Sequence, residues 1–158
     1  MKRQIVTSSE FEAFTSSLIE LPLNHIWQGY GSAIFLEFGS LRQRLRRDGS
    51  VGNPTGEWTL AIEWSWRIEG KRLIWCGSFS DAQRWPRVFT SLLNAKVASV
   101  SLMGRLLEID VMLSNGLHVV SCMTAEGDPQ WGLINRCNKS VNSMGVSAGR
   151  LIFEEIDT

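Results

Sequence analysis

Apolar and polar residues alternate strictly along residues 57–69, and this stretch carries the clearest structural signal in the sequence. Every second position is apolar: Trp58, Leu60, Ile62, Trp64, Trp66 and Ile68. A period of two is typical of a strand with one buried face. The run exceeds the usual strand of roughly five to six residues, so it predicts a bulge or a bend where one sheet curves into another. We expect the tryptophans to form a buried stripe.

Two short helices are predicted, one at the N-terminus and one in the middle of the chain. Ser9 and Glu12 have the spacing of a capping box, and apolar residues recur at helical spacing from there to about Glu20. Helical spacing also recurs over residues 86–93, where a proline is tolerated in the first turn. These patterns predict an N-terminal helix within residues 1–22 and a connecting helix within residues 78–93.

The first β-rich region contains two predicted hairpins. The Gly29–Ser32 turn joins a strand around Trp27 to a strand over residues 34–38. A shorter apolar run, residues 73–76, should pair back with the strand that ends at Ile68. Antiparallel neighbours are therefore expected throughout this region.

The register of the two later hairpins can be predicted by requiring that the apolar residues of both strands lie on one face. A two-residue turn at Gly104–Arg105 would place Leu102 opposite Leu107. At residues 114–116, a two-residue Asn-Gly loop would mix the faces. A three-residue loop with a left-handed glycine instead aligns Val111 with Val119, so we predict the longer loop.

The C-terminal part contains short elements separated by turns. Residues 127–129 predict a turn, residues 131–134 a short strand, and residues 138–149 a loop of small residues. Residues 150–156 predict a last strand at the edge of a sheet.

These elements predict an α+β fold that is predominantly antiparallel β, with a meandering sheet curled into a barrel or a two-layer sandwich. One domain should cover residues 1–158, with a first β half over 23–77 and a second over 94–158. Leu23-Asn24 and Leu93-Asn94 each precede a hairpin. This parallel hints at two pseudo-repeated four-strand halves.

Composition narrows the class of protein. A chain of 158 residues, with 44% hydrophobic and 20% charged residues, fits one globular domain. Its formal net charge of zero removes the global electrostatic argument for a nucleic-acid or anionic-membrane partner. The three cysteines are widely spaced and suit a reducing compartment. With no signal peptide or long apolar stretch, we expect a cytoplasmic protein with no membrane partner.

The segment from Gly39 to Gly56 holds the best candidate binding residues. It carries four arginines, which are Arg42, Arg44, Arg46 and Arg47. Loops longer than about twelve to fifteen residues are uncommon in compact domains, so this one is either mobile or functional. A solvated loop is the ordinary interpretation. An acidic protein partner ranks next, and nucleic acid ranks below it because the tryptophans that could stack on bases are assigned to the core.

Glu63 and Arg67 are weaker binding candidates, because they share the polar face of the 57–69 strand. Cross-strand charge pairs on a wet sheet face would explain them without function. Closeness to a pocket would strengthen them.

No catalytic, metal or cofactor site is predicted. Gly145–Gly149 matches the G-x-S-x-G pattern of serine hydrolases, which needs a strand before the serine, a helix after it and a later histidine. No histidine follows Gly149 in this sequence. His25 and His118 lack the local spacing of metal ligands.

Three segments carry a resemblance to known sequences: residues 31–39, residues 56–67, and Ser-Asn-Gly-Leu at 114–117 together with Trp131. In these segments the chain resembles a group of small uncharacterised bacterial proteins. The resemblance covers most of Leu23 to Trp131. It implies a bacterial origin and a single β-rich domain, and it brings no activity with it.

The leading hypothesis is therefore a non-enzymatic cytoplasmic protein-interaction module, accessory or immunity-like, that uses a loop or an exposed sheet edge. The alternative is a small-ligand binder or enzyme using the interior of a curved sheet, which requires a deep tryptophan-lined pocket with inward polar groups. The second alternative is nucleic-acid binding through the arginine-rich loop.

Overall fold

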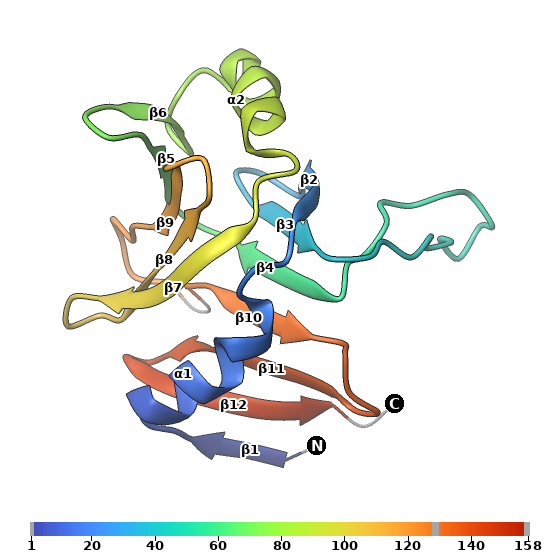
Figure 1. The fold of residues 1–158 in the computed structure, drawn as a ribbon, viewed down its shortest axis with the longest axis vertical. Coiled ribbons are helices and arrows are strands. Elements are labelled where there is room, and N and C mark those ends of the chain that lie inside the picture. Colours follow the sequence, from blue (N-terminus) through green and yellow to red (C-terminus); the bar gives the residue numbers. More distant parts are fainter. Residues whose placement is uncertain (1, 128–129, 157–158) are drawn as a thin grey trace.

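The 57–69 segment bends into two strands that belong to different sheets, in a computed structural model that describes residues 2–127 and 130–156. Strand β4 (Trp58–Ile62) lies in a seven-stranded sheet, and β5 (Trp66–Glu69) lies in a five-stranded sheet (Figure 1). The predicted bend between sheets is confirmed. Trp66 is 1% exposed, whereas Trp64, at the bend, is 44% exposed. The buried-stripe prediction is wrong for Trp64 because the alternation of the strand is interrupted there.

The seven-stranded sheet is antiparallel throughout and collects strands from both ends of the chain. Its order is β1 (Lys2–Ile5), β12 (Arg150–Ile156), β11 (Val141–Ser147), β10 (Gly132–Asn135), β4, β3 (Ile34–Phe38) and β2 (Leu23–Gln28).

This sheet corrects two predictions for the C-terminal part of the chain and adds one N-terminal strand that the sequence did not predict. The predicted loop over residues 138–149 is wrong, because residues 141–147 form β11, with Met144 and Val146 buried. Pairing with β10 and β12 outweighs the low strand propensity of its small residues. Strand β12 is not at the edge, since β1 pairs with it. All four residues of β1 are exposed, so this strand has no alternation of buried and exposed positions from which it could be predicted.

The five-stranded sheet tests the two predicted hairpin registers. Its order is β6 (Ile74–Gly77), β5, β9 (His118–Ser121), β8 (Glu108–Leu113) and β7 (Val97–Met103).

The later hairpin has the predicted three-residue loop, with Val111 opposite Val119 and Gly116 at φ +83°. The earlier register is wrong, because Leu102 lies opposite Ile109. The connection is four residues long, and Leu107 takes a left-handed conformation. The shift of two residues keeps Val100 and Leu102 on their predicted face, so the apolar pattern could not detect it. A bulge between Val97 and Ser99 reverses the faces at the start of the strand, where Val97 is buried and Ala98 is exposed.

Both predicted helices are present. Helix α1 (Ser8–Thr15) has its capping box at Thr7 and Glu10, so the predicted box at Ser9 and Glu12 is wrong by two residues. A 3-10 turn (Ser16–Leu18) continues α1. Helix α2 (Trp85–Leu92) follows a 3-10 turn (Ala82–Arg84) and confirms the mid-chain helix.

Aromatic contacts fix both helices on the core. In α1, Phe14 meets Trp58 edge-on at a centroid distance of 5.0 Å. In α2, Trp85 meets Trp66 at 5.1 Å. Such edge-to-face pairs contribute about 0.5–1.5 kcal/mol beyond the burial of their area.

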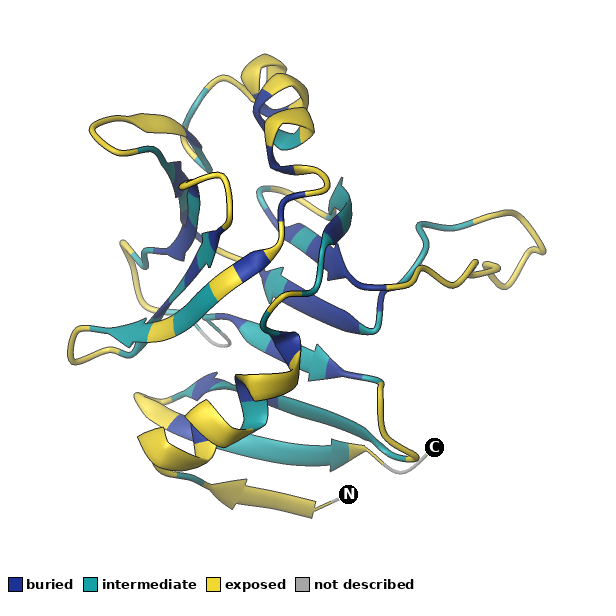
Figure 2. Cartoon of the chain, viewed as in Figure 1, coloured by how far each residue is buried: buried dark blue, intermediate teal, exposed yellow. Residues whose placement is uncertain are grey.

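Figure 2 shows that strands β3 and β4 are largely buried.

The fold is therefore α+β, mostly antiparallel β in two sheets with two short helices. The described residues form no closed barrel. The sheets are joined where β2 and β7 begin, because the Leu23 amide donates to the Ala95 carbonyl at 2.8 Å. No helix within residues 2–127 and 130–156 is long and apolar enough to cross a membrane.

Each half of the chain contributes to both sheets. Strands β2, β3 and β4 form a meander before the chain crosses to β5, and β7, β8 and β9 form another before it crosses to β10. The crossing segments then pair with each other, β4 with β10 and β5 with β9. The stretches 23–77 and 94–158 therefore each contain strands of both sheets.

Candidate functional site

Residues 39–56 form an irregular hairpin that projects from the seven-stranded sheet, and we call this hairpin the arm (Figure 1). Arg42 and Thr55 exchange two backbone hydrogen bonds of 2.8 and 3.0 Å. Leu45 and Val51 form a bridge nearer the tip. The segment predicted as a long loop is therefore organised by its own backbone hydrogen bonds.

Asp48 is the one acidic residue of the arm, and it forms hydrogen bonds within the turn at the tip. The Asp48 carboxylate accepts hydrogen bonds from the Ser50 hydroxyl at 2.6 Å and the Ser50 amide at 2.9 Å. These two hydrogen bonds lower the pKa of Asp48. Because the carboxylate is committed to the turn, it does not pair with the arginines.

The four predicted arginines are all exposed on this arm: Arg42, Arg44, Arg46 and Arg47. Within the described part of the chain, no carboxylate forms an ion pair with any of them. Four arginines and one aspartate give the arm a net charge of +3. Leu45 and Val51 are also exposed and place an apolar pair among the positive charges.

A buried carboxylate on β3 holds the base of the arm. Glu37 accepts hydrogen bonds from the Gly56 amide at 2.9 Å, the Thr59 hydroxyl at 2.5 Å and the Trp27 indole at 3.2 Å. Its side chain is 1% exposed. Buried charges are stable only when such partners satisfy them.

Arg136 completes this cluster from the end of β10. Its guanidinium donates to the Thr59 hydroxyl at 2.6 Å. Burial lowers the pKa of Arg136, the Glu37 carboxylate opposes this, and the positive charge of Arg44 adds to it. An arginine remains charged at neutral pH despite such effects. The arm thus begins beside a buried ionic cluster.

Two further contacts fix the strands of the arm near the sheet. The Ser40 amide donates to the Glu57 carboxylate at 2.9 Å. His25 and Asn53 form a side-chain hydrogen bond of 3.0 Å between β2 and the returning strand of the arm. The base is therefore held on both sides.

Glu63 and Arg67, which the sequence places on one polar face, are not brought together. Glu63 lies at the bend and is exposed, whereas Arg67 lies on β5 and forms an ion pair with Glu69 at 2.5 Å. Among the described residues, Glu63 and Arg67 form no ion pair with each other. The bend between the two sheets separates them.

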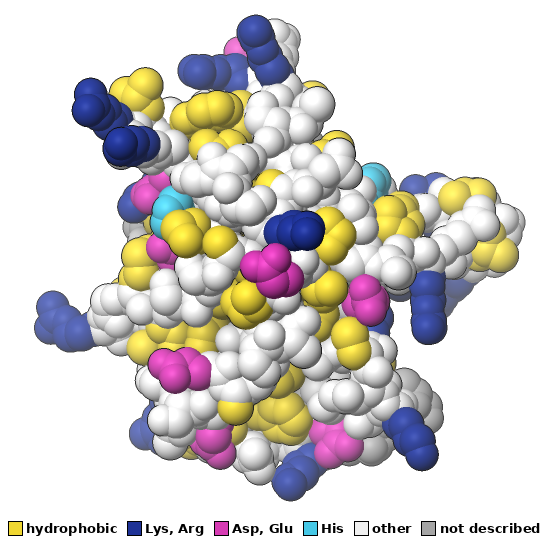
Figure 3. Space-filling model, in the orientation of Figure 1, with side chains coloured by type: hydrophobic (Ala, Val, Ile, Leu, Met, Phe, Trp, Pro, Cys, Tyr) yellow, Lys and Arg dark blue, Asp and Glu magenta, His cyan; other side chains and the backbone are white. Residues whose placement is uncertain are grey.

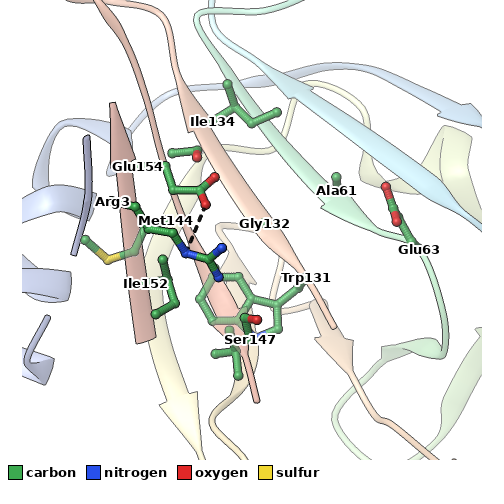
Figure 4. Close-up of a pocket in the computed structure, with 13 residues that line it drawn as sticks. Arg3, Ala61, Glu63, Trp131, Gly132, Ile134, Met144, Ser147, Ile152 and Glu154 are labelled. Carbon is green, nitrogen blue, oxygen red and sulfur yellow. Dashed lines mark ion pairs between the residues drawn. The ribbon is translucent and has the colours of Figure 1, made fainter. Parts of the chain in front are cut away.

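Glu63 does line a groove of about 360 Å³ on one face of the seven-stranded sheet (Figure 4). Ala61, Gly132 and Gly145 lie opposite one another on neighbouring strands and form its floor. Arg3 and Glu154 form an ion pair of 3.4 Å at one side, and Figure 4 shows Glu63 on the other. Glu154 is thus engaged by Arg3, and Glu63 lies across the groove from this ion pair.

The G-x-S-x-G segment is not a nucleophile elbow. Ser147 ends β11, and Ala148 and Gly149 form a turn with φ of +49° and +74° that leads into β12. A hydrolase needs a helix after the serine, and here a strand follows. The described residues contain no cluster of three His, Cys, Asp or Glu side chains suited to a metal.

Two features of the structure are missed by reasoning from the sequence. Glu37 alternates with the apolar residues Ile34, Leu36 and Phe38, so the sequence places its side chain on the polar face of the strand. The pairing of residues 73–76 with the preceding strand is confirmed, but the side chains of residues 73–75 are exposed. The charged neighbours Lys71 and Arg72 could have indicated that residues 73–75 lie on the surface.

Comparison with protein-family models, curated proteins and solved structures finds no match. The arm combines four exposed arginines, an exposed apolar pair and an anchored base. This combination suits contact with another macromolecule.

Proposed function

We propose that this chain is a non-enzymatic protein-interaction module that binds an acidic partner protein through the arm. The observation that carries the proposal is the set of four exposed arginines, none of which forms an ion pair with a described residue, on a hairpin anchored by the buried Glu37. An arm already ordered in the free protein loses less conformational entropy on binding. Its charge would steer an acidic partner and raise the association rate.

The chemistry of the arm favours a protein over a nucleic acid. Binders of single strands rely on aromatic side chains on which bases stack, and residues 39–56 contain no aromatic residue. Leu45 and Val51 instead offer apolar contact area beside the arginines, and arginine is enriched in protein interfaces. Nucleic acid is kept as the second candidate on the strength of the four positive charges alone.

The cellular setting is part of the same proposal. The three cysteines are all free thiols, which suits a reducing bacterial cytoplasm. We assign the module an accessory or immunity-like role, in which binding the partner is itself the function. The alternative of a ligand binder or enzyme has less support, because the interior between the sheets is filled by the core side chains.

Affinity capture from the source organism with a charge-reversed arm tests the proposal. The arm variant carries Arg42→Glu, Arg44→Glu, Arg46→Glu and Arg47→Glu. A control variant carries Lys96→Glu, Arg105→Glu, Lys139→Glu and Arg150→Glu, which are exposed positions elsewhere. Both variants change the net charge equally, so a difference between them depends on the location of the charge.

We expect mass spectrometry to identify an acidic protein that the wild type and the control capture and the arm variant loses. Calorimetry with that purified protein should then show at least a roughly tenfold weaker Kd for the arm variant, equivalent to about 1.4 kcal/mol. Equal capture by both variants would rule the arm out. Retention of single-stranded DNA or RNA in a filter assay, falling with salt and lost only in the arm variant, would favour the nucleic-acid alternative.

A further inference from the structure

A second surface, distant from the arm, lies between the β5–β6 hairpin and α2. We call it the β6 cleft, a hollow of about 600 Å³. Its residues include Leu73, Ile74 and Trp75 from the hairpin and Arg84, Arg87 and Val88 from the helical side. Figure 1 places the hairpin and the arm on opposite sides of the molecule. A role for this surface is therefore independent of the proposed function.

One wall of the β6 cleft is apolar and exposed. Leu73 is 74% exposed and Ile74 is 61% exposed, and the neighbouring Trp75 is also exposed. These residues are consecutive, and β6 forms the end of its sheet. Native proteins usually protect an apolar sheet edge from other chains, and a contiguous apolar patch commonly marks an interaction site.

The surroundings of that wall are basic. Lys71 and Arg72 lie at the tip of the hairpin, and Arg84 and Arg87 lie on the helical wall. No carboxylate among residues 2–127 and 130–156 forms an ion pair with any of these four. Figure 3 shows basic groups beside hydrophobic atoms at the end of the molecule that carries β6 and α2.

Asp81, the one acidic residue among the described residues that line the β6 cleft, already has a structural role. The Asp81 carboxylate accepts a hydrogen bond from the Gln83 amide at 3.0 Å and caps the turn before α2. Four basic residues and one acidic residue leave a net charge of +3 around an apolar wall. The charge complement of this surface is a negatively charged and partly apolar ligand.

We infer that the β6 cleft binds an acidic segment of a partner protein that also carries apolar side chains. Carboxylates of the segment would meet the basic groups, and its apolar side chains would cover Leu73, Ile74 and Trp75. The cleft is concave between a strand and a helix, with the nearly buried Val88 among its residues. Such a shape receives protruding side chains, whereas a flat lipid surface would reach only its rim.

Selection of peptides against the full-length protein tests this inference even while the partner is unidentified. A phage library of random linear peptides is panned on the wild type, with counter-selection on the double variant Leu73→Ser, Arg87→Glu. Both positions are exposed, so the variant should fold, which circular dichroism checks. Trp75 is left intact because its indole packs closely against Gly70.

We expect the selected peptides to be enriched in Asp or Glu together with Leu, Phe or Trp. A labelled synthetic copy should bind the wild type in fluorescence anisotropy, and Leu73→Ser and Arg87→Glu should each weaken it roughly tenfold. The matched controls Leu106→Ser and Arg105→Glu, at another exposed hairpin tip, should leave binding unchanged. The four-arginine arm variant should also bind normally, which separates this surface from the arm.

Two results would overturn the inference. One is the absence of any peptide that prefers the wild type to the double variant. The other is sedimentation of the wild type, but not of the double variant, with phosphatidylserine vesicles when no peptide is selected. That second result would assign the surface to an anionic lipid.

Discussion

The Glu37 carboxylate accepts a hydrogen bond from the Gly56 amide at 2.9 Å, and this contact joins β3, the neighbour of the edge strand β2 in the seven-stranded sheet, to the end of the arm. The approach at Gly56 is close, because a Cβ atom there would lie 2.4 Å from the Phe38 carbonyl oxygen. A buried charge and a glycine without a side chain thus determine together where the arm leaves the sheet. The direction of the arginines depends on a buried residue that is not itself on the binding surface.

Replacing Glu37 tests this anchoring directly. We expect Glu37→Ala to lower the free energy of unfolding by about 2–4 kcal/mol, because three donors and the Arg136 charge lose their buried partner. Glu37→Gln should cost less, since the amide oxygen can still accept a hydrogen bond. Urea unfolding measures both, and hydrogen exchange should show faster amide exchange in residues 39–56.

Glu12→Ala is the control for that experiment, because Glu12 is exposed on α1. It should change the free energy of unfolding by no more than about 0.5 kcal/mol. If Glu37→Ala were as mild as this control, the buried cluster would not anchor the arm.

Two tryptophans two positions apart test the bend in the 57–69 segment. Trp66 is fully buried against Trp85, so Trp66→Ala should cost about 3–5 kcal/mol. Trp64 lies at the bend with much of its side chain exposed, so Trp64→Ala should cost less than about 1 kcal/mol. Thermal and urea unfolding of the pair would contradict the bend if the two losses were equal.

Periodicity in the sequence predicts some elements of this fold and misses others. The bend in the 57–69 segment, helix α2 and the three-residue loop ending at Gly116 follow from spacing and parity, which are local properties. Strand β11 does not, because its small residues are organised by pairing with β10 and β12, and β10 is itself held by β4 from the first half of the chain. Long-range pairing of this kind leaves no local trace.

The candidate site can be predicted only in part, for a related reason. The four arginines of the arm are visible as a cluster in the sequence, but their anchor is not. The burial of Glu37 depends on Gly56, Thr59 and Trp27, which come from three different elements of the fold.

The turn predicted at residues 127–129 lies partly outside the described residues, at Asp128 and Pro129.

Gly116 and Gly132 form a matched pair that isolates backbone strain. Neither would bring a new Cβ atom within 4 Å of another group, but Gly116 alone has a positive φ, +83°. Gly116→Ala should therefore lose about 1–2 kcal/mol of stability through left-handed strain. Gly132→Ala should be neutral or stabilising, by up to about 1 kcal/mol, because alanine reduces the freedom of the unfolded chain. Equal effects in urea unfolding would contradict the three-residue loop geometry.

The three thiols should react at different rates with iodoacetamide near neutral pH. Cys137 is exposed, Cys122 is partly buried and Cys76 is fully buried, so labelling should follow that order. Burial raises the pKa of all three thiols and that of Cys76 furthest, to about 11, which lowers the fraction of reactive thiolate most at Cys76. Intact-mass measurements would show one fast adduct, and Cys137→Ser should remove it. A fast adduct on Cys76 would contradict its placement in the core.

Alkaline pH offers a separate test of Cys76, because burial raises its pKa from 9.0 to about 11. In the folded state the thiol keeps its proton up to about 11, whereas in the unfolded state it loses the proton above about 9.0. Ionisation therefore favours the unfolded state increasingly as the pH rises from the lower to the higher value. We expect the wild type to lose stability over this range more steeply than Cys76→Ala, whose small cavity costs the same at every pH. Parallel stability curves for the two proteins would show that Cys76 is not the group that titrates.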